Sequence, residues 1–84
     1  MKNQLEIHLW LGLRRLADNQ ASVRVEANTV GQALKALEEL HPGLAQPIKE
    51  GVSLSVDGKI ITQSLHQPLN SGQEIHLIPL IRGG

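Results

Sequence analysis

Hydrophobic and polar residues alternate over several short stretches of the chain, which is the period-two pattern of a β-strand with one buried face. The first stretch covers residues 4–13, with Leu5, Ile7, Leu9 and Leu11 on one side and Glu6, His8 and Trp10 on the other. A second covers residues 22–27, where Val23 and Val25 alternate with charged residues. Asp18-Asn19 lies between the two stretches and predicts a turn, so the two strands should form a hairpin.

The pattern then changes to a helical one. Thr29 followed by Gln32 fits a capping box. In this motif the Thr29 side chain accepts from the Gln32 backbone N–H, and the Gln32 side chain accepts from the Thr29 backbone N–H. The apolar residues that follow recur at spacings of three and four and form one stripe, made of Val30, Ala33, Leu34, Leu37 and Leu40. Pro42 and Gly43 should end this helix. Residues 44–51 show no regular pattern.

Two further strands and a closing strand complete the pattern. Residues 52–56 alternate again, and Asp57-Gly58 is a strong signal for a tight hairpin turn because both of its central residues need positive φ. The short return strand should cover residues 59–62. The pattern predicts a loop over residues 63–73 and the last strand over residues 74–81.

This order of elements predicts an α+β protein of the β-grasp, or ubiquitin-like, type. One main helix would pack on one face of a mixed sheet of four or five strands, because each element has one apolar face and all must share one core. The first and last strands would lie side by side at the centre of the sheet. Residues 1–84 should form a single domain, since a chain of 84 residues does not divide into two cores. Residues 82–84 should form a flexible tail.

Composition and charge exclude several classes of function. The chain has eight basic and eight acidic residues, so it lacks the excess of positive charge that binding to a nucleic-acid backbone requires. No apolar run approaches the length of a membrane span, and the start of the chain lacks the features of a signal peptide. We therefore expect a cytoplasmic protein without membrane or nucleic-acid partners. The absence of cysteine excludes disulfides and a cysteine nucleophile.

No set of side chains suggests a catalytic site. If the first and last strands pair, His8 and His76 come close together on the sheet face away from the helix, but two ligands are too few for a metal site. We expect no metal and no permanently bound cofactor. His41 at the helix end and His66 in a loop have no catalytic partners in the pattern, and the serines lack a recognisable histidine and carboxylate arrangement. Whether the chain is part of an enzyme is left open.

The same sheet face would carry an apolar surface, which favours partner docking over catalysis. Trp10 is the residue type that often dominates an interface. The expected docking residues on the sheet are His8, Trp10, His76, Ile78 and Leu80. The alternative is that residues 44–51 or 63–73 cover this face.

The sequence closes on Arg82-Gly83-Gly84, directly after the last predicted strand. Glycine has no side chain to bury and loses much conformational freedom when it is ordered, so Gly83 and Gly84 should not stabilise the domain. Gly83 and Gly84 could instead form a thin rod that enters a narrow channel of a partner, where Gly84 presents its carboxylate. Ile81 and Arg82 are expected to contact the same partner, and the Arg82 guanidinium could pair with a carboxylate there or simply keep the terminus soluble. The alternative is an ordinary frayed terminus.

Two segments carry a family resemblance. Residues 9–44, with a Thr-Val helix start and a His-Pro exit, and residues 69–84, with a glycine turn, an acidic residue, a strand containing proline and a final Gly-Gly, resemble the ubiquitin-like sulfur carriers of the MoaD and ThiS type. The likeness is strongest to the small subunit of molybdopterin synthase. Three positions depart from that pattern, namely Gln73, Leu80 and Arg82, and Arg82-Gly83-Gly84 is closer to the ending of ubiquitin.

The resemblance implies a role for Gly84. An E1-like enzyme would adenylate its carboxylate with ATP, and a sulfur donor protein would convert it to a thiocarboxylate. A larger synthase subunit, or another sulfur-accepting enzyme, would then receive the sulfur. Molybdopterin synthesis is the favoured pathway, and the same carrier chemistry could also serve thiamine synthesis, cysteine synthesis or tRNA thiolation. A protein modifier conjugated through Gly84, or an interaction domain whose tail is inert, would share the same pattern.

Overall fold

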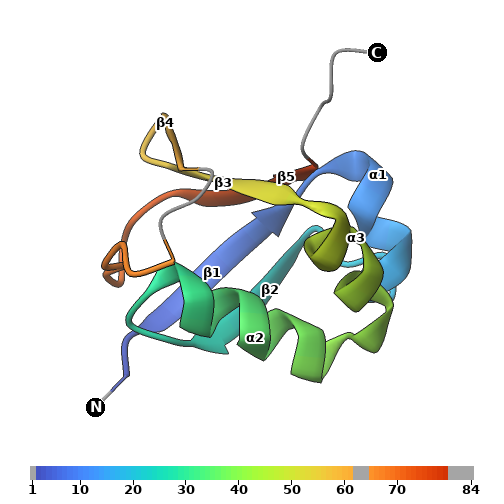
Figure 1. The fold of residues 1–84 in the computed structure, drawn as a ribbon, viewed down its shortest axis with the longest axis horizontal. Helices are drawn as coiled ribbons and strands as arrows, with labels where there is room; N and C mark the ends of the chain where they lie inside the picture. Colours follow the sequence, from blue (N-terminus) through green and yellow to red (C-terminus); the bar gives the residue numbers. More distant parts are fainter. Residues whose placement is uncertain (1, 62–64, 80–84) are drawn as a thin grey trace.

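The computed structural model describes residues 2–61 and 65–79. Its centre is a five-stranded mixed sheet in the order β2-β1-β5-β3-β4. The bounds of the strands are β1 Gln4–Leu9, β2 Ser22–Glu26, β3 Val52–Val56, β4 Lys59–Ile61 and β5 Ile75–Pro79. β1 and β5 pair in parallel, and the other neighbours pair antiparallel (Figure 1). The predicted β-grasp fold, with the first and last strands adjacent at its centre, is confirmed.

The helices lie on one side of this sheet. α2 (Val30–Leu40) crosses in front of β1 and β2, and α3 (Ala45–Glu50) lies on the same side (Figure 1). Two 3₁₀ turns complete the helical part, Arg15–Ala17 before β2 and Pro42–Leu44 between α2 and α3. Within the described residues no helix is long and apolar enough to cross a membrane.

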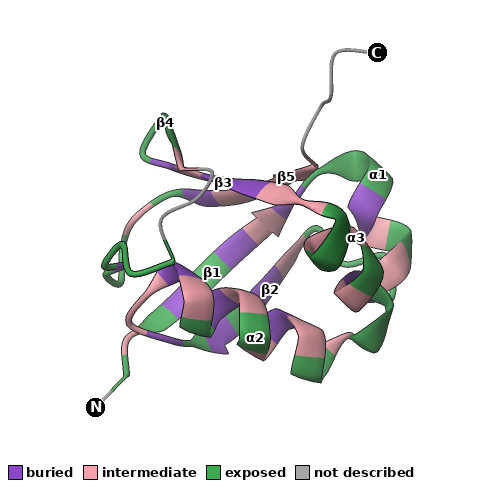
Figure 2. Ribbon diagram, in the orientation of Figure 1, coloured by how far each residue is buried: buried purple, intermediate pink, exposed green. Residues whose placement is uncertain are grey.

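The core fills the space between the sheet and α2 (Figure 2). Alternate residues of β1, β2, β3 and β5 point inward, as the period-two pattern predicts. The largest fully buried side chains are Leu5, Ile7, Leu37, Leu44, Leu54, Leu69, Ile75 and Leu77. Burial of these residues also fixes the outward residues of the same strands on the opposite face. A shift of the strand register by one residue would expose the apolar side chains and bury the outward ones.

The predicted turn and cap are largely confirmed. Asp57 has φ 50° and Gly58 has φ 87°, as the tight hairpin between β3 and β4 requires. At the start of α2, the Gln32 backbone N–H donates to Thr29 Oγ1 at 3.3 Å. The Gln32 side-chain oxygen accepts from the Asn28 backbone N–H at 2.8 Å, one residue earlier than the reciprocal bond of a capping box. The helix start is therefore correct, although the second half of the box is shifted.

The prediction for residues 10–13 is wrong. β1 ends at Leu9, and residues Leu11–Arg14 form the short helix α1. Trp10 is the helix N-cap, and its carbonyl accepts a hydrogen bond of 2.8 Å from the Leu13 backbone N–H. The turn brings Leu13 into the core and leaves Leu11 71% exposed, so Leu11 does not continue the buried row of β1.

Other boundaries also differ from the prediction. Residues Ala45–Glu50 form a helix where no regular structure was expected, and Leu40 is 55% exposed although it continues the stripe of α2. α2 ends at Leu40, so its last residue extends past the core. Glu74 precedes β5, while Thr62, Leu80 and Ile81, expected in strands, lie outside the described residues.

Gly43 allows a close backbone contact between the two 3₁₀ turns. A Cβ at this position would lie 2.9 Å from the Leu16 carbonyl oxygen, whereas a Cβ at Gly12 would meet nothing within 4 Å. We expect Gly43→Ala to lower the free energy of unfolding by about 1–3 kcal/mol, because backbone must move to admit the methyl group. Urea unfolding checks this, with Gly12→Ala as the matched control. An equal loss in both variants would contradict the steric explanation.

Candidate docking face and groove

The face of the sheet away from α2 carries two stacked imidazoles at its centre. His8 on β1 and His76 on β5 are register partners across the parallel pair. Their ring centroids lie 5.0 Å apart with an angle of 30° between the planes. The prediction that pairing of the first and last strands would bring these two residues together is confirmed. Both side chains are partly exposed, His8 by 40% and His76 by 42%.

Carboxylates lie on one side of the imidazole pair. His76 Nε2 donates to Glu74 Oε1 at 3.0 Å, and His8 Nε2 is 3.9 Å from Glu6 Oε1. Glu6 also accepts a hydrogen bond of 3.3 Å from Ser22 Oγ and lies 3.9 Å from Arg24 Nε. Because both glutamates precede their histidine by two residues, they occupy the end of the face that is farther from Trp10.

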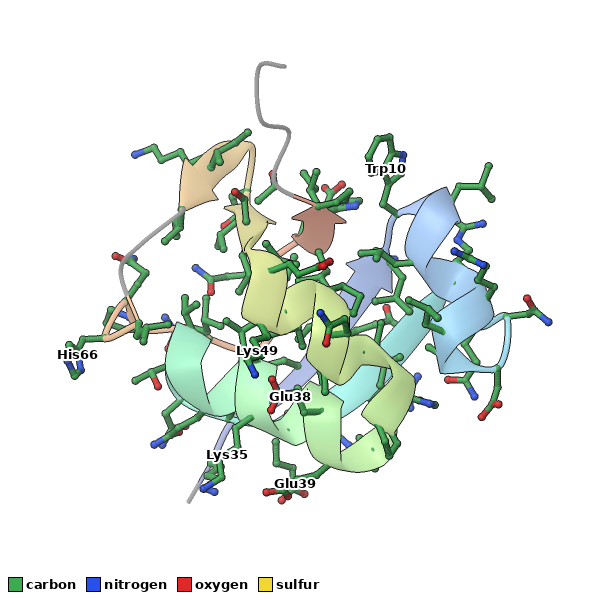
Figure 3. All side chains as sticks on the ribbon, turned by 45° about the vertical axis from the view of Figure 1, so that its right-hand side comes forward. Trp10, Lys35, Glu38, Glu39, Lys49 and His66 are labelled. Atoms are coloured by element: carbon green, nitrogen blue, oxygen red, sulfur yellow. The ribbon has the colours of Figure 1, made fainter. Side chains whose placement is uncertain are left out.

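Trp10 lies at the opposite end of this row. Its backbone N–H donates to the Leu77 carbonyl at 3.2 Å, which holds the corner between β1 and α1 against β5. The side chain is 49% exposed and projects outward between the end of β5 and α1 (Figure 3). A large aromatic side chain held by the backbone at a partly open position is a suitable anchor for a protein interface.

A groove of about 360 Å³ runs between the imidazole pair and this corner. Its described lining residues are His8, Leu9, Trp10, Arg14, Ser55, His76, Leu77 and Ile78. Ile78 and Trp10 supply apolar surface, and the remaining exposed side chains are polar. We refer to this cavity as the groove, and to His8, Trp10, His76 and Ile78 as the docking face.

The segments that could have covered the docking face lie elsewhere. α3 contacts α2 and β3, and its Ile48 packs against the core. In the loop, the Leu65 and Gln67 carbonyls accept hydrogen bonds from the first residues of α2. Within residues 2–61 and 65–79, the alternative of a covered face is therefore wrong.

The structure places four of the predicted site residues together, and the others lie outside the described residues. His8, Trp10, His76 and Ile78 all line the groove. The other predicted site residues, Leu80, Ile81, Arg82, Gly83 and Gly84, lie outside the described residues.

Sequence reasoning missed three residues of the outer face. Arg14 lines the groove because α1 turns back over the end of β1, and nothing in the pattern signals that turn. Ser55 could have been found, since its alternation with Leu54 places it outward on β3. Ile60 faces Ser55 across the β3–β4 pair and is 65% exposed, which extends the apolar surface to the sheet edge.

The remaining histidines lie away from the groove. His41 is the C-cap of α2, and its Nδ1 is 3.8 Å from Asp18 Oδ2. His66 is exposed and points away from the body of the protein (Figure 3). Among residues 2–61 and 65–79, no group of three or more His, Cys, Asp or Glu side chains is placed to hold a metal ion.

Solved structures confirm the fold. SAMP1 from Haloferax volcanii is 27% identical, with a TM-score of 0.76 over 98% of this chain and 100% of that one. A chain of the Amycolatopsis orientalis BexX/CysO complex is 20% identical, with a TM-score of 0.77 over 95% and 99% of the two chains. A chain from the complex of subunits 1 and 2 of the Helicobacter pylori molybdopterin-converting factor is 21% identical, with a TM-score of 0.66 over 96% and 99%. The likenesses under 25% identity concern the fold alone.

Fold and surface together define a small ubiquitin-like protein of the β-grasp type. The model of the ThiS family matches residues 9–84, which is nearly the whole chain. The chain therefore belongs to the ThiS family of ubiquitin-like sulfur carriers. Among curated proteins, none matches the chain.

Proposed function

We propose that this protein is a cytoplasmic sulfur carrier whose Gly84 carboxylate is adenylated by an E1-like enzyme and converted to a thiocarboxylate. The observation that carries the proposal is the family match, which runs through residue 84 and so includes Gly83 and Gly84. These glycines follow within a few residues of β5, one of the two central strands. The reactive group would thus be attached shortly after a strand that is paired on both sides, with β1 and with β3.

The chemistry requires two substitutions at the Gly84 carboxyl group. In the first, a carboxylate oxygen attacks the α-phosphorus of ATP, and pyrophosphate leaves. In the second, a sulfide equivalent attacks the carbonyl carbon of the acyl-adenylate, and AMP leaves with the oxygen that bridged to phosphorus. ATP is a substrate of the activating enzyme, and the carrier needs no cofactor of its own. The product holds a nucleophilic sulfur without any cysteine.

The carrier contributes a thin connection and a surface to be recognised. Glycine has no Cβ, so Gly83 and Gly84 fit a channel that excludes other residues. Five residues separate Pro79 from the Gly84 carboxylate, and a chain of that length spans at most about 18 Å. Any enzyme that acts on Gly84 must therefore approach the end of β5 closely. The docking face lies beside that end.

Partners and pathway follow from the family resemblance. We propose an E1-like enzyme, a sulfur donor protein and a larger synthase subunit as successive partners, with molybdopterin synthesis as the pathway. The complexes of CysO with BexX and of subunits 1 and 2 of the molybdopterin-converting factor support binding to a second protein. Carriers for thiamine, cysteine or tRNA thiolation would use the same chemistry at Gly84.

Intact mass measurement tests the central step. The protein is incubated with its host's activating enzyme, ATP and sulfide. We expect the mass to rise by the difference between one sulfur and one oxygen atom, and the product to react with a thiol-directed reagent. The omission of ATP is the control and should leave the mass unchanged. The proposal would be contradicted if the mass stayed unchanged in the presence of ATP although the same enzyme preparation converts another carrier protein.

A second candidate function is protein modification through an isopeptide bond from Gly84. It is favoured by the likeness to SAMP1, the small archaeal modifier protein 1, and by Arg82, which gives the ubiquitin-like ending Arg-Gly-Gly. Incubation of the tagged protein in host lysate with ATP separates the two functions. Larger covalent conjugates that disappear without ATP support modification.

A further inference from the structure

Three polar groups of the groove can donate hydrogen bonds to a ligand, namely the Arg14 guanidinium, the Trp10 indole N–H and the Ser55 hydroxyl. The Nε2–H of His76 is already used by Glu74. None of the described residues that line the groove carries a carboxylate. A cavity with a permanent cation, further donors and no acidic lining suits an anionic group.

Arg14 is positioned for such a contact. Its Nε–H donates to the Leu9 carbonyl at 3.1 Å, which fixes the plane of a half-buried guanidinium at the end of β1. This bond uses one of the five N–H donors and leaves both terminal nitrogens free to bind a ligand. A guanidinium held in one orientation binds a carboxylate better than a freely rotating one, because less side-chain freedom is lost on binding.

The charged groups near the imidazole pair leave the groove side open. Glu74 and Glu6 approach the Nε2 atoms of His76 and His8, and Arg24 approaches Glu6 from β2. Within the described residues, neither Nδ1 atom has a hydrogen-bond partner. Both carboxylates lie at one end of the row, with Glu74 hydrogen-bonded to His76 and Glu6 at 3.9 Å from His8, and Arg14 is the charged residue among the described lining of the groove at the other end.

We propose that the groove is a carboxylate-binding subsite that receives an Asp or Glu side chain of the enzyme that activates Gly84. The identity of the partner rests on the proposed function, whereas the chemistry of the ligand rests on the groove. A volume of about 360 Å³ accommodates one or two side chains. Ile78 and Trp10 would exclude water from the ion pair and so strengthen it. Because the tail spans at most about 18 Å from Pro79, the partner surface next to its active site comes close to the end of β5, and the groove lies beside that end.

Binding of a small carboxylate tests the subsite without any partner. N-acetylglutamate α-methylamide, whose only carboxylate is that of the side chain, is titrated into the protein and followed by NMR on the indole N–H signal, which belongs to a single residue because Trp10 is the only tryptophan. We expect a saturable shift that the uncharged N-acetylglutamine α-methylamide does not cause. Arg14→Gln should abolish the shift. Arg15→Gln, which removes the same charge from the neighbouring residue outside the groove, should retain it. Equal shifts with both compounds, or in both variants, would overturn the proposal.

Affinity for the activating enzyme tests the identity of the partner. Calorimetry without ATP separates docking from chemistry. We expect Arg14→Gln to weaken binding by about tenfold or more, since hydrogen bonds between charged groups contribute at that level, and Arg15→Gln to change it by less than about threefold. Arg14→Lys keeps the positive charge but loses the planar pair of N–H donors of the guanidinium, so its affinity should lie between those of the two glutamine variants. Equal binding by wild type and Arg14→Gln would refute a carboxylate contact with this enzyme.

The two measurements fail in different ways. If the activating enzyme does not bind the wild-type protein at all, the proposed function is wrong, and the titration with N-acetylglutamate α-methylamide still decides whether the groove binds carboxylates. Melting curves of each variant exclude unfolding as the cause of a lost signal.

Discussion

Deletion of Gly84 is expected to abolish thiocarboxylate formation completely and to leave the free energy of unfolding unchanged. The reacting carboxyl group would then belong to Gly83 and would lie one residue short of the catalytic atoms of the activating enzyme. A misplacement of this size removes the advantage of a positioned reactant, which is worth several orders of magnitude in rate. The described core extends from Leu5 to Leu77, so the deletion removes none of its residues.

Mass measurement after incubation with the activating enzyme, ATP and sulfide checks the loss of activity, and urea unfolding checks the fold. Gly84→Ala is the matched control, because it keeps the length of the chain and adds only a methyl group. It should retain more activity than the deletion and lose part of it to steric exclusion from the channel. A deletion variant that is still converted at the wild-type rate would show that Gly84 is not the reacting residue.

Leu77→Ala is expected to lower the free energy of unfolding by about 2–5 kcal/mol, a large share of the stability of a small domain. Leu77 is fully buried on β5 and pairs with Leu9 on one side and Leu54 on the other. Truncation of this side chain leaves a cavity at the middle of the sheet, where the surrounding strands cannot close it.

The next residue provides the matched control. Ile78 loses the same number of carbon atoms on truncation to alanine, but it points to the outer face and lines the groove. Ile78→Ala should cost less than half as much stability and should weaken partner binding more. Urea unfolding and calorimetry with the activating enzyme measure the two effects. If both variants lose the same stability, the two faces of β5 are equally packed and Ile78 is not a docking residue.

The pattern of the sequence predicted the elements whose burial alternates over several residues. In β1, in β2 and in the last three residues of β3, buried residues alternate with more exposed ones. The helix α2 has both an N-cap residue and an apolar stripe. For the same reason the pattern placed His8 and His76 on the outer face, because the side on which Ile7 and Ile75 are buried determines where their neighbours point. His8, His76 and Ile78 could thus be placed in advance, whereas Trp10 was placed on this face as part of a strand that in fact ends at Leu9.

The missed elements are too short to show a period. α1 has four residues, and its Leu11 continues the alternation of β1 by coincidence. α3 has six residues and contains Pro47, which suggests a loop but is tolerated in the first turn of a helix. Arg14 joins the groove only through the turn that α1 makes over Leu9. Its role depends on contacts between distant parts of the chain, which a local pattern does not contain.

The parallel pairing of β1 and β5 also determines when the protein can fold during its synthesis. Ile7 pairs with Ile75, so the centre of the sheet closes a loop that contains most of the chain. A nascent chain that still lacks β5 has β1 with an open edge and many core residues without partners. The five-stranded sheet is therefore complete only after β5 has left the ribosome, and the groove, which needs both His8 and His76, is complete at the same time. Prematurely terminated chains would present no docking face and would not compete with complete carriers for the activating enzyme.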